Sequence, residues 1–177
     1  KAFRLPIVDS AEKNKEKLSP DFVRYIQQSV VYFSYFGRFQ YPYMHEVALS
    51  KSYNFSSIPP VNYEAVANIP PAFNDSFMSA ASYRLFAEQY YRMQLEVGKY
   101  FNDSTHAFRV QDSIVKLAVK TMPDQTAQYV IALHLYAIIR SIPLDTAADR
   151  INKFKKRWPS SEYIKDLDAQ YAIAKRI

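Results

Sequence analysis

Scarcity of glycine is the feature that most constrains what this chain can fold into, because only two glycines occur among its 177 residues. Tight turns between β-strands favour glycine next to asparagine or aspartate. So few glycines argue against an all-β fold and against a glycine-rich phosphate-binding loop. The ten prolines can instead separate helices without any help from glycine. We therefore predict an all-α fold.

The first long helix is predicted to begin at "SPDF". Ser19 can cap the helix, and Pro20 suits the first helical position because a missing N–H does no harm there. Apolar residues then repeat at helical spacing through Phe33. We expect the helix to end within residues 37–41, because Pro42 disfavours the helical conformation of the residue that precedes it.

The helices in the rest of the chain are predicted from the prolines and other residues that interrupt helical spacing. Five of the ten prolines lie in residues 42–78, which indicates a Pro-rich irregular loop. Helical spacing returns near Ser79, and two antiparallel helical hairpins are expected over 104–141 and 143–177, the last helix capped by Ser160 or Ser161. The total is about six main helices. Residues 1–18 are interpreted as a linker or frayed lead segment, and 19–177 as a single helical domain.

No metal or thiol chemistry is predicted for this chain. It contains no cysteine, which excludes a disulfide framework, a zinc-thiolate site and a cysteine nucleophile. The stretch that starts at His45 begins like the zinc motif H-E-x-x-H, but Leu49 occupies the place of the second histidine. His106 and His134 have no partner at ligand spacing. We predict no metal ligands and no cofactor-binding residues.

A catalytic centre is not predicted either. The nucleophile motif G-x-S-x-G is absent. Glu88 and Asp112 lie in helical stretches, but nothing in the sequence places these two carboxylates together for acid–base catalysis. An enzyme with a dispersed site would require His134 to lie beside an acid in a deep pocket. We therefore predict no catalytic residues and interpret the chain as a non-enzyme.

Charge disfavours nucleic acid as a partner, and hydropathy disfavours a membrane-spanning segment. The net charge is +6, but the surplus lies at the two ends of the chain, and the one dense basic run is Lys153–Trp158. Cations at the end of a helix interact favourably with its dipole, so nucleic-acid binding is not expected. The longest apolar run, Tyr129–Ile139, has eleven residues. A membrane span needs about twenty, and the run is predicted to be a buried core helix.

Aromatic residues make up 16% of the chain, and nine Phe or Tyr residues fall between Phe22 and Tyr43. The favoured interpretation is that they fill a helical core, because most of them follow helical spacing. The alternative is a Tyr-rich groove that binds a peptide or glycan, since tyrosine offers an apolar face with a polar rim. An exposed concave cluster of four tyrosines would favour that alternative: Tyr35, Tyr41, Tyr43 and Tyr53.

Three stretches together resemble a known family. They are "EKNKEKLSPDFVRYIQQSVVYFSYFGRFQYP", "SAASYRLFAEQYYRMQLEV" and "FKKRWPSSEYIKDLDAQYAIAKRI". They resemble the helical segment upstream of the thioredoxin-like domain in TlpA-type (AhpC/TSA-related) thiol-disulfide oxidoreductases of Gram-negative bacteria. The resemblance covers nearly all of residues 12–177. Its features are a Leu-Ser-Pro helix start, a Tyr-Arg-x-Phe helix after a Pro-rich loop, and a Pro-x-Ser-x-Tyr joint before the last helix.

The resemblance implies a role without chemistry of its own. In such proteins the thioredoxin-like domain carries the reactive Cys-x-x-Cys pair, and this chain has no cysteine. The implied role is a non-catalytic accessory domain that positions the redox domain or mediates protein interaction, with homodimerisation as a further expectation. The implied location is periplasmic, with a lipoprotein anchor in a missing N-terminal segment. Lys1 and Ile177 would then be the ends of a fragment.

Overall fold

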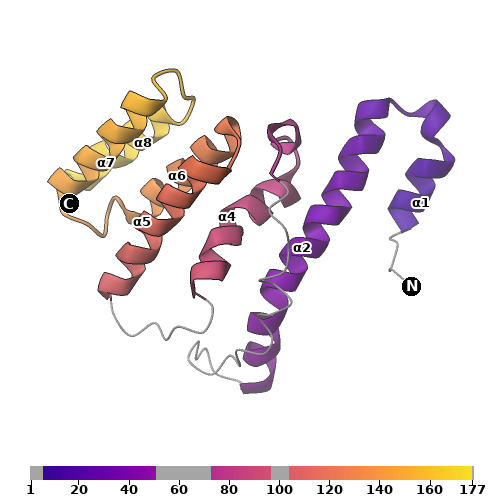
Figure 1. The fold of residues 1–177 in the computed structure, drawn as a ribbon, viewed down its shortest axis with the longest axis horizontal. Helices are drawn as coiled ribbons and strands as arrows, with labels where there is room; N and C mark the ends of the chain where they lie inside the picture. The colour runs from indigo at the N-terminus through magenta and orange to yellow at the C-terminus, as the bar shows by residue number, and fades with distance from the viewer. Residues whose placement is uncertain (1–5, 51–72, 97–103, 177) are drawn as a thin grey trace. The chain divides into compact units, whose positions relative to one another are not determined.

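The computed structural model describes residues 6–50, 73–96 and 104–176. These residues contain seven α-helices, two 3₁₀-helices and no β-strand (Figure 1). The all-α prediction is confirmed, with one main helix more than the six or so expected. Contacts divide the chain into two compact units, Lys1–Val110 and Gln111–Ile177, whereas the sequence predicts one boundary, at residue 18.

The first unit begins with two helical segments that fold back on a long helix. These are α1 (Pro6–Lys13) and the 3₁₀-helix η1 (Lys15–Lys17), followed by α2 (Pro20–Ser50). Helix α1 packs against α2, and its Val8 and Ala11 are buried. The lead segment is therefore helical over most of its length and is held by apolar contacts.

The start of α2 matches the prediction. The Oγ of Ser19 accepts a hydrogen bond of 3.2 Å from the backbone N–H of Phe22, and Pro20 is the first helical residue. The carbonyl of Ser19 accepts the first helical bond, from the N–H of Val23 at 3.1 Å. Such a cap satisfies one of the backbone donors that the first turn of a helix leaves open.

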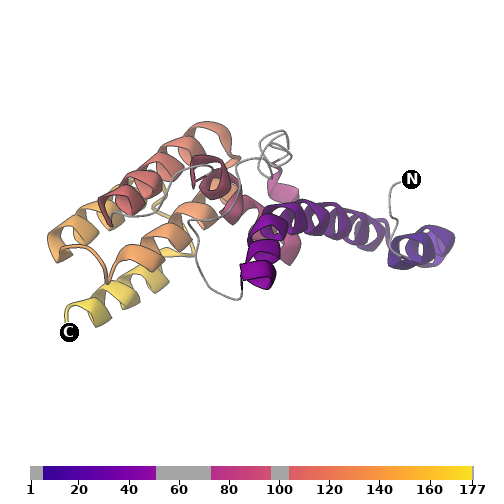
Figure 2. The ribbon, with the colours of Figure 1, turned by 90° about the horizontal axis from the view of Figure 1, so that it is seen from below.

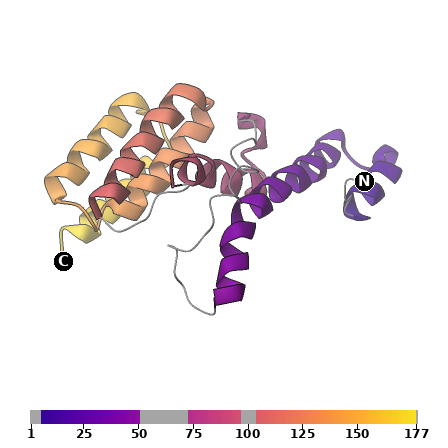
Figure 3. The same cartoon turned by 60° about the horizontal axis from the view of Figure 1, so that its bottom comes forward.

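The predicted end of α2 is wrong, because the helix continues through Gly37 and Pro42 to Ser50. A proline inside a helix removes one backbone hydrogen bond and crowds the preceding turn, and helices accommodate it by bending. Figure 3 shows that α2 changes direction along its length. The loop predicted for 42–78 is helical as far as Ser50, and η4 (Asp75–Phe77) lies near its end. Residues 51–72 of that loop lie outside the described residues.

Aromatic rings join α2 to α4 (Ala81–Glu96) in the core of the first unit. Tyr32 is 2% exposed, and its ring centroid lies 4.8 Å from that of Tyr83 and 5.2 Å from that of Phe86. The hydroxyl of Tyr83 accepts a hydrogen bond of 2.9 Å from the backbone N–H of Asn74. The favoured interpretation of the aromatic residues therefore holds for Tyr32, whose ring fills a core. It is wrong for Phe22, Tyr25 and Phe33, which are exposed.

The second unit includes the end of α5 (Ser104–Thr121), then α6 (Asp124–Ile138), α7 (Leu144–Arg157) and α8 (Ile164–Ala174). Figure 2 shows these helices lying alongside one another, in line with the two predicted hairpins. Helix α6 is the central one, because it is buried on most sides, including at Val130, His134 and Leu135. The predicted buried core helix is therefore observed.

The predicted serine cap of α8 is wrong. The residue before the helix is Tyr163, and no side chain caps it. Backbone turns fill the joint instead, with the N–H of Ser161 bonded to the carbonyl of Trp158 at 3.1 Å. The carbonyl of Ser161 then accepts from the N–H of Ile164 at 3.3 Å, so the joint continues as tight turns up to the helix.

Candidate functional site

Of the three histidines singled out by the sequence, only His134 has its side chain in the part of the chain that the structure describes. No group of three or more potential metal-ligating side chains occurs there. His134 is only 6% exposed and lies on α6 among its buried apolar residues. The side chains of His45 and His106 lie outside the described residues.

The two acids considered for catalysis belong to different units. Glu88 is half-buried on α4, and burial raises the pKa of its carboxyl against the opposing effects of Arg92 and a hydrogen bond from Gln89. Asp112 on α5 forms an ion pair with Arg150 on α7, with 2.8 Å between Oδ1 and the guanidinium nitrogen. That ion pair gives Asp112 a structural role in the second unit.

A polar contact ties the end of α7 to the start of α6. Trp158, which follows the last residue of α7, is 8% exposed, and its indole Nε1 donates a hydrogen bond of 2.7 Å to Oδ1 of Asp124. The other carboxylate oxygen of Asp124 accepts a bond of 2.8 Å from Gln128. Asp124 thus binds a donor with each oxygen while its charge favours the N-terminus of α6.

A second set of contacts fixes α8. Lys155 on α7 lies 2.6 Å from Oδ1 and 2.8 Å from Oδ2 of Asp168 on α8, so its ammonium group contacts both carboxylate oxygens. The amide of Gln170 on α8 donates a bond of 2.7 Å to the hydroxyl of Tyr136 on α6. We call this set of contacts the hairpin clamp; its residues are Asp124, Tyr136, Lys155, Trp158, Asp168 and Gln170.

Sequence reasoning missed the hairpin clamp. The sequence explains the run Lys153–Trp158 by the favourable interaction of cations with the end of a helix, yet Lys155 and Trp158 each contact another helix. Their partners are 13 and 34 residues away along the chain. Only the spacing of the apolar residue Trp158 with Phe154, which marks a buried face of α7, hinted at a contact.

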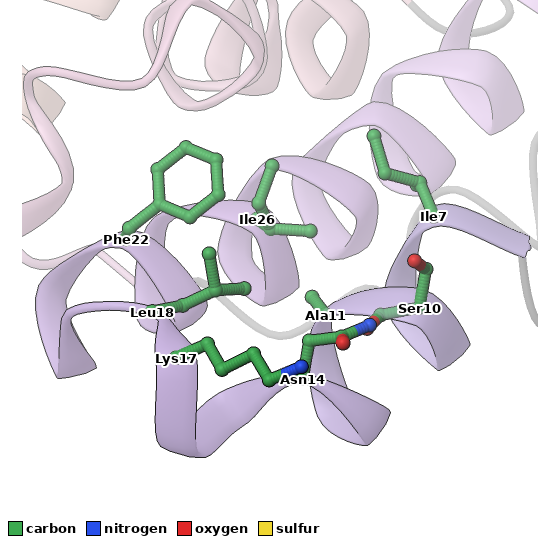
Figure 4. Close-up of a pocket in the computed structure, with 8 residues that line it drawn as sticks. All are labelled: Ile7, Ser10, Ala11, Asn14, Lys17, Leu18, Phe22 and Ile26. Carbon is green, nitrogen blue, oxygen red and sulfur yellow. The ribbon is translucent and has the colours of Figure 1, made fainter.

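The first unit carries an open groove where α1 and η1 meet α2 (Figure 4). Its volume is about 360 Å³, and it is lined by eight residues: Ile7, Ser10, Ala11, Asn14, Lys17, Leu18, Phe22 and Ile26. Most of these are apolar. Two large ones remain open to solvent, because Ile7 is 54% exposed and Phe22 is 47% exposed. We call this the α1–α2 groove.

Polar atoms line one edge of the α1–α2 groove. The amide of Asn14 donates a hydrogen bond of 2.9 Å to the carbonyl of Ser10, which fixes the asparagine side chain at the end of α1. Figure 4 shows the side chain of Lys17 extending along the same edge toward Asn14, apart from Phe22. The groove therefore joins an apolar floor to an edge with one positive charge, an arrangement suited to an amphipathic ligand.

The alternative Tyr-rich groove is described at only one of its four residues. Tyr35 is half-buried, with its ring centroid 6.1 Å from that of Tyr32 and 5.6 Å from that of Phe86. It belongs to the edge of the aromatic core between α2 and α4. The side chains of Tyr41 and Tyr43, and all of Tyr53, lie outside the described residues, so a peptide- or glycan-binding groove there stays a prediction.

Comparison with known proteins identifies no relative. No protein-family model matches the chain, and no match was found among curated proteins or among solved structures. The resemblance to TlpA-type proteins therefore rests on the three quoted stretches alone. Among the described helices, none combines the length and the apolar character that crossing a membrane requires.

Proposed function

We propose that this chain is a non-catalytic helical accessory domain of a periplasmic thioredoxin-like thiol-disulfide oxidoreductase, and that it holds the redox domain in position. The observation that carries the proposal is the hairpin clamp. Trp158 joins α7 to α6, and Lys155 joins α7 to α8. The resemblance of the three quoted stretches supplies the identity of the neighbouring domain.

The clamp supports a positioning role because it limits how α8 moves against α6 and α7. A domain joined to a fixed helix samples fewer orientations than one on a flexible linker. Restricting orientation raises the effective concentration of the attached reactive group near a bound partner. Ring contact between Tyr129 on α6 and Tyr163 before α8, with centroids 6.2 Å apart, adds an apolar contact at the start of the same helix.

The proposal includes the partners and the cellular location that the resemblance implies. The partners are the adjacent thioredoxin-like domain and other proteins, with homodimerisation as one mode of interaction. The site of action is the periplasm, with any membrane attachment made through a lipoprotein tether outside these residues. The chain itself supplies no catalytic group to the reaction, and the parent protein is the thiol-disulfide oxidoreductase.

The test begins with the coding sequence beyond Ile177, which is expected to encode a Cys-x-x-Cys domain in the same reading frame. The complete protein is then compared with its Lys155→Ala variant, using Lys153→Ala as the matched control. Reduction of a small disulfide reagent is expected to stay unchanged, while reduction of a protein disulfide changes in Lys155→Ala alone. A reading frame without a Cys-x-x-Cys domain would overturn the proposal.

A further inference from the structure

The apolar floor of the α1–α2 groove continues along α2. Phe22, Ile26 and Phe33 are spaced four and seven residues apart, which places them on one face of the helix. Phe33 is 61% exposed, the most exposed of the large hydrophobic residues described. The stripe from Phe22 to Phe33 extends over about 16 Å at the rise of an α-helix, or about three turns.

This shape matches one recognised way of binding peptides. In this mode an amphipathic helix lays its apolar face into an apolar groove, with anchors at i, i+3, i+4 and i+7. Exposed large apolar residues that form a continuous stripe commonly mark interaction sites, whereas scattered ones do not. Val31 is an exposed apolar residue that does not belong to the stripe: it is 42% exposed, but it lies on the opposite face of α2.

The positive charge of Lys17 at the edge of the groove favours an acidic partner helix over a basic one. Lys17 lines the groove, and it forms no ion pair with any carboxylate whose side chain the structure describes. The neighbouring groove residues Ser10 and Asn14 are uncharged. A ligand that places an acidic group beside its apolar anchors would meet Lys17, whereas a basic ligand would be repelled.

We propose that the α1–α2 groove and the stripe through Phe33 bind an amphipathic helix of a partner protein, with an acidic residue of that helix facing Lys17. The apolar anchors of the partner cover Phe22, Ile26 and Phe33. Ile7 on α1 flanks the bound helix at the end of the groove. This site is independent of the positioning role proposed above, because it lies in the first unit and makes no use of the hairpin clamp.

The test uses three synthetic peptides of about 18 residues, long enough to form a helix on binding. One carries a leucine stripe flanked by glutamate, the second carries the same stripe flanked by lysine, and the third is a scramble of the first. Binding to the full chain is measured by fluorescence anisotropy, with sodium oleate as a competitor. The acidic peptide is expected to bind more tightly than the lysine peptide and the scramble.

Two matched pairs of variants locate the site. Lys17→Glu is expected to weaken binding of the acidic peptide by about tenfold, while Lys15→Glu, on the same 3₁₀-helix but outside the groove, stays within about twofold. Phe33→Ser is expected to weaken it by about tenfold as well, and Val31→Ser by less than about twofold. These four side chains are exposed, so folding is expected to survive each change.

Three outcomes would overturn this proposal. The first is equal effects of Lys17→Glu and Lys15→Glu, which would make the contact a general charge effect. The second is binding of oleate without binding of any peptide, which would make the groove a site for lipid. The third is concentration-dependent dimerisation in sedimentation experiments that Phe33→Ser abolishes, because a second copy of the chain would then occupy the stripe.

Discussion

The indole Nε1 of Trp158 donates a hydrogen bond of 2.7 Å to Oδ1 of Asp124, although 34 residues separate the two along the chain. Trp158 directly follows the last residue of α7, and Asp124 is the first residue of α6. One contact therefore fixes the end of one helix to the beginning of another. A bond from a largely buried donor to a charged acceptor is stronger than one between neutral groups.

Replacing Trp158 by phenylalanine is expected to destabilise the chain by about 1–2 kcal/mol. Phenylalanine keeps an aromatic ring against Phe154, whose centroid lies 5.1 Å away, but it has no N–H to donate. Urea unfolding followed by circular dichroism measures the change. In a double-mutant cycle, Trp158→Phe should have little further effect once Asp124→Ala is present. Equal effects in both backgrounds would show that ring packing, and not the hydrogen bond, stabilises this joint.

Local signals in the sequence predicted the start of α2, but they predicted neither its end nor the cap of α8. Ser19 caps α2 as expected, because capping depends on atoms only three residues apart. Pro42 did not end α2, because the local preference against proline in a helix is outweighed by the rest of a 31-residue helix. Ser160 and Ser161 did not cap α8, because backbone turns after Trp158 occupy the joint.

The candidate sites were less predictable than the fold. The pairing of Lys155 with Asp168 depends on how α7 and α8 pack, and no local pattern specifies the partner of a lysine. The apolar spacing of Phe22, Ile26 and Phe33 was visible in the sequence and was interpreted as a core face. The structure leaves Phe22 and Phe33 open because α1 is only eight residues long and covers one end of that face.

Lys155→Ala is expected to destabilise the chain by about 0.5–1 kcal/mol, and Lys153→Ala by less than about 0.5 kcal/mol. Lys155 contacts both oxygens of Asp168 and its side chain is 34% exposed, whereas Lys153 pairs with Asp149 at 74% exposure. Less exposure means less screening by water and salt. Urea unfolding at low and high salt measures both effects. The explanation by exposure fails if Lys155→Ala and Lys153→Ala are equally stable, or if high salt leaves the difference between their free energies of unfolding unchanged.

Tyr83→Phe is expected to destabilise the first unit by about 1–2 kcal/mol with little change in packing. The phenol oxygen of Tyr83 accepts the N–H of Asn74 at 2.9 Å, and the residue is fully buried. Phenylalanine would leave that partly buried N–H without its acceptor. Hydrogen exchange at the Asn74 amide provides a specific measurement and should become faster in the variant. Unchanged exchange at Asn74 would contradict the assigned role.

Ser19→Ala is expected to cost about 1 kcal/mol of stability, because it removes the oxygen that accepts the N–H of Phe22. Ser34→Ala is the matched control, since Ser34 is an exposed residue inside the same helix. Alanine has the higher helix propensity, so the control should be neutral or slightly stabilising. Thermal unfolding distinguishes the two variants. A similar loss of stability in both would mean that the cap contributes nothing.

The raised pKa of Tyr32 predicts how the free energy of unfolding changes at alkaline pH. Burial, together with the neighbouring Tyr83 and Tyr35, raises the pKa of the Tyr32 hydroxyl from 10.0 to about 12. Above pH 10 the unfolded chain loses this proton while the folded chain keeps it, so the free energy of unfolding falls as pH rises from 10 to about 12. Tyr32→Phe removes this contribution, and its stability should fall less steeply over the same range. Urea unfolding at several pH values, with tyrosinate absorbance as a second readout, measures the difference between the two proteins. Parallel pH profiles would show that Tyr32 ionises equally in both states, which its 2% exposure against Tyr83 and Phe86 argues against.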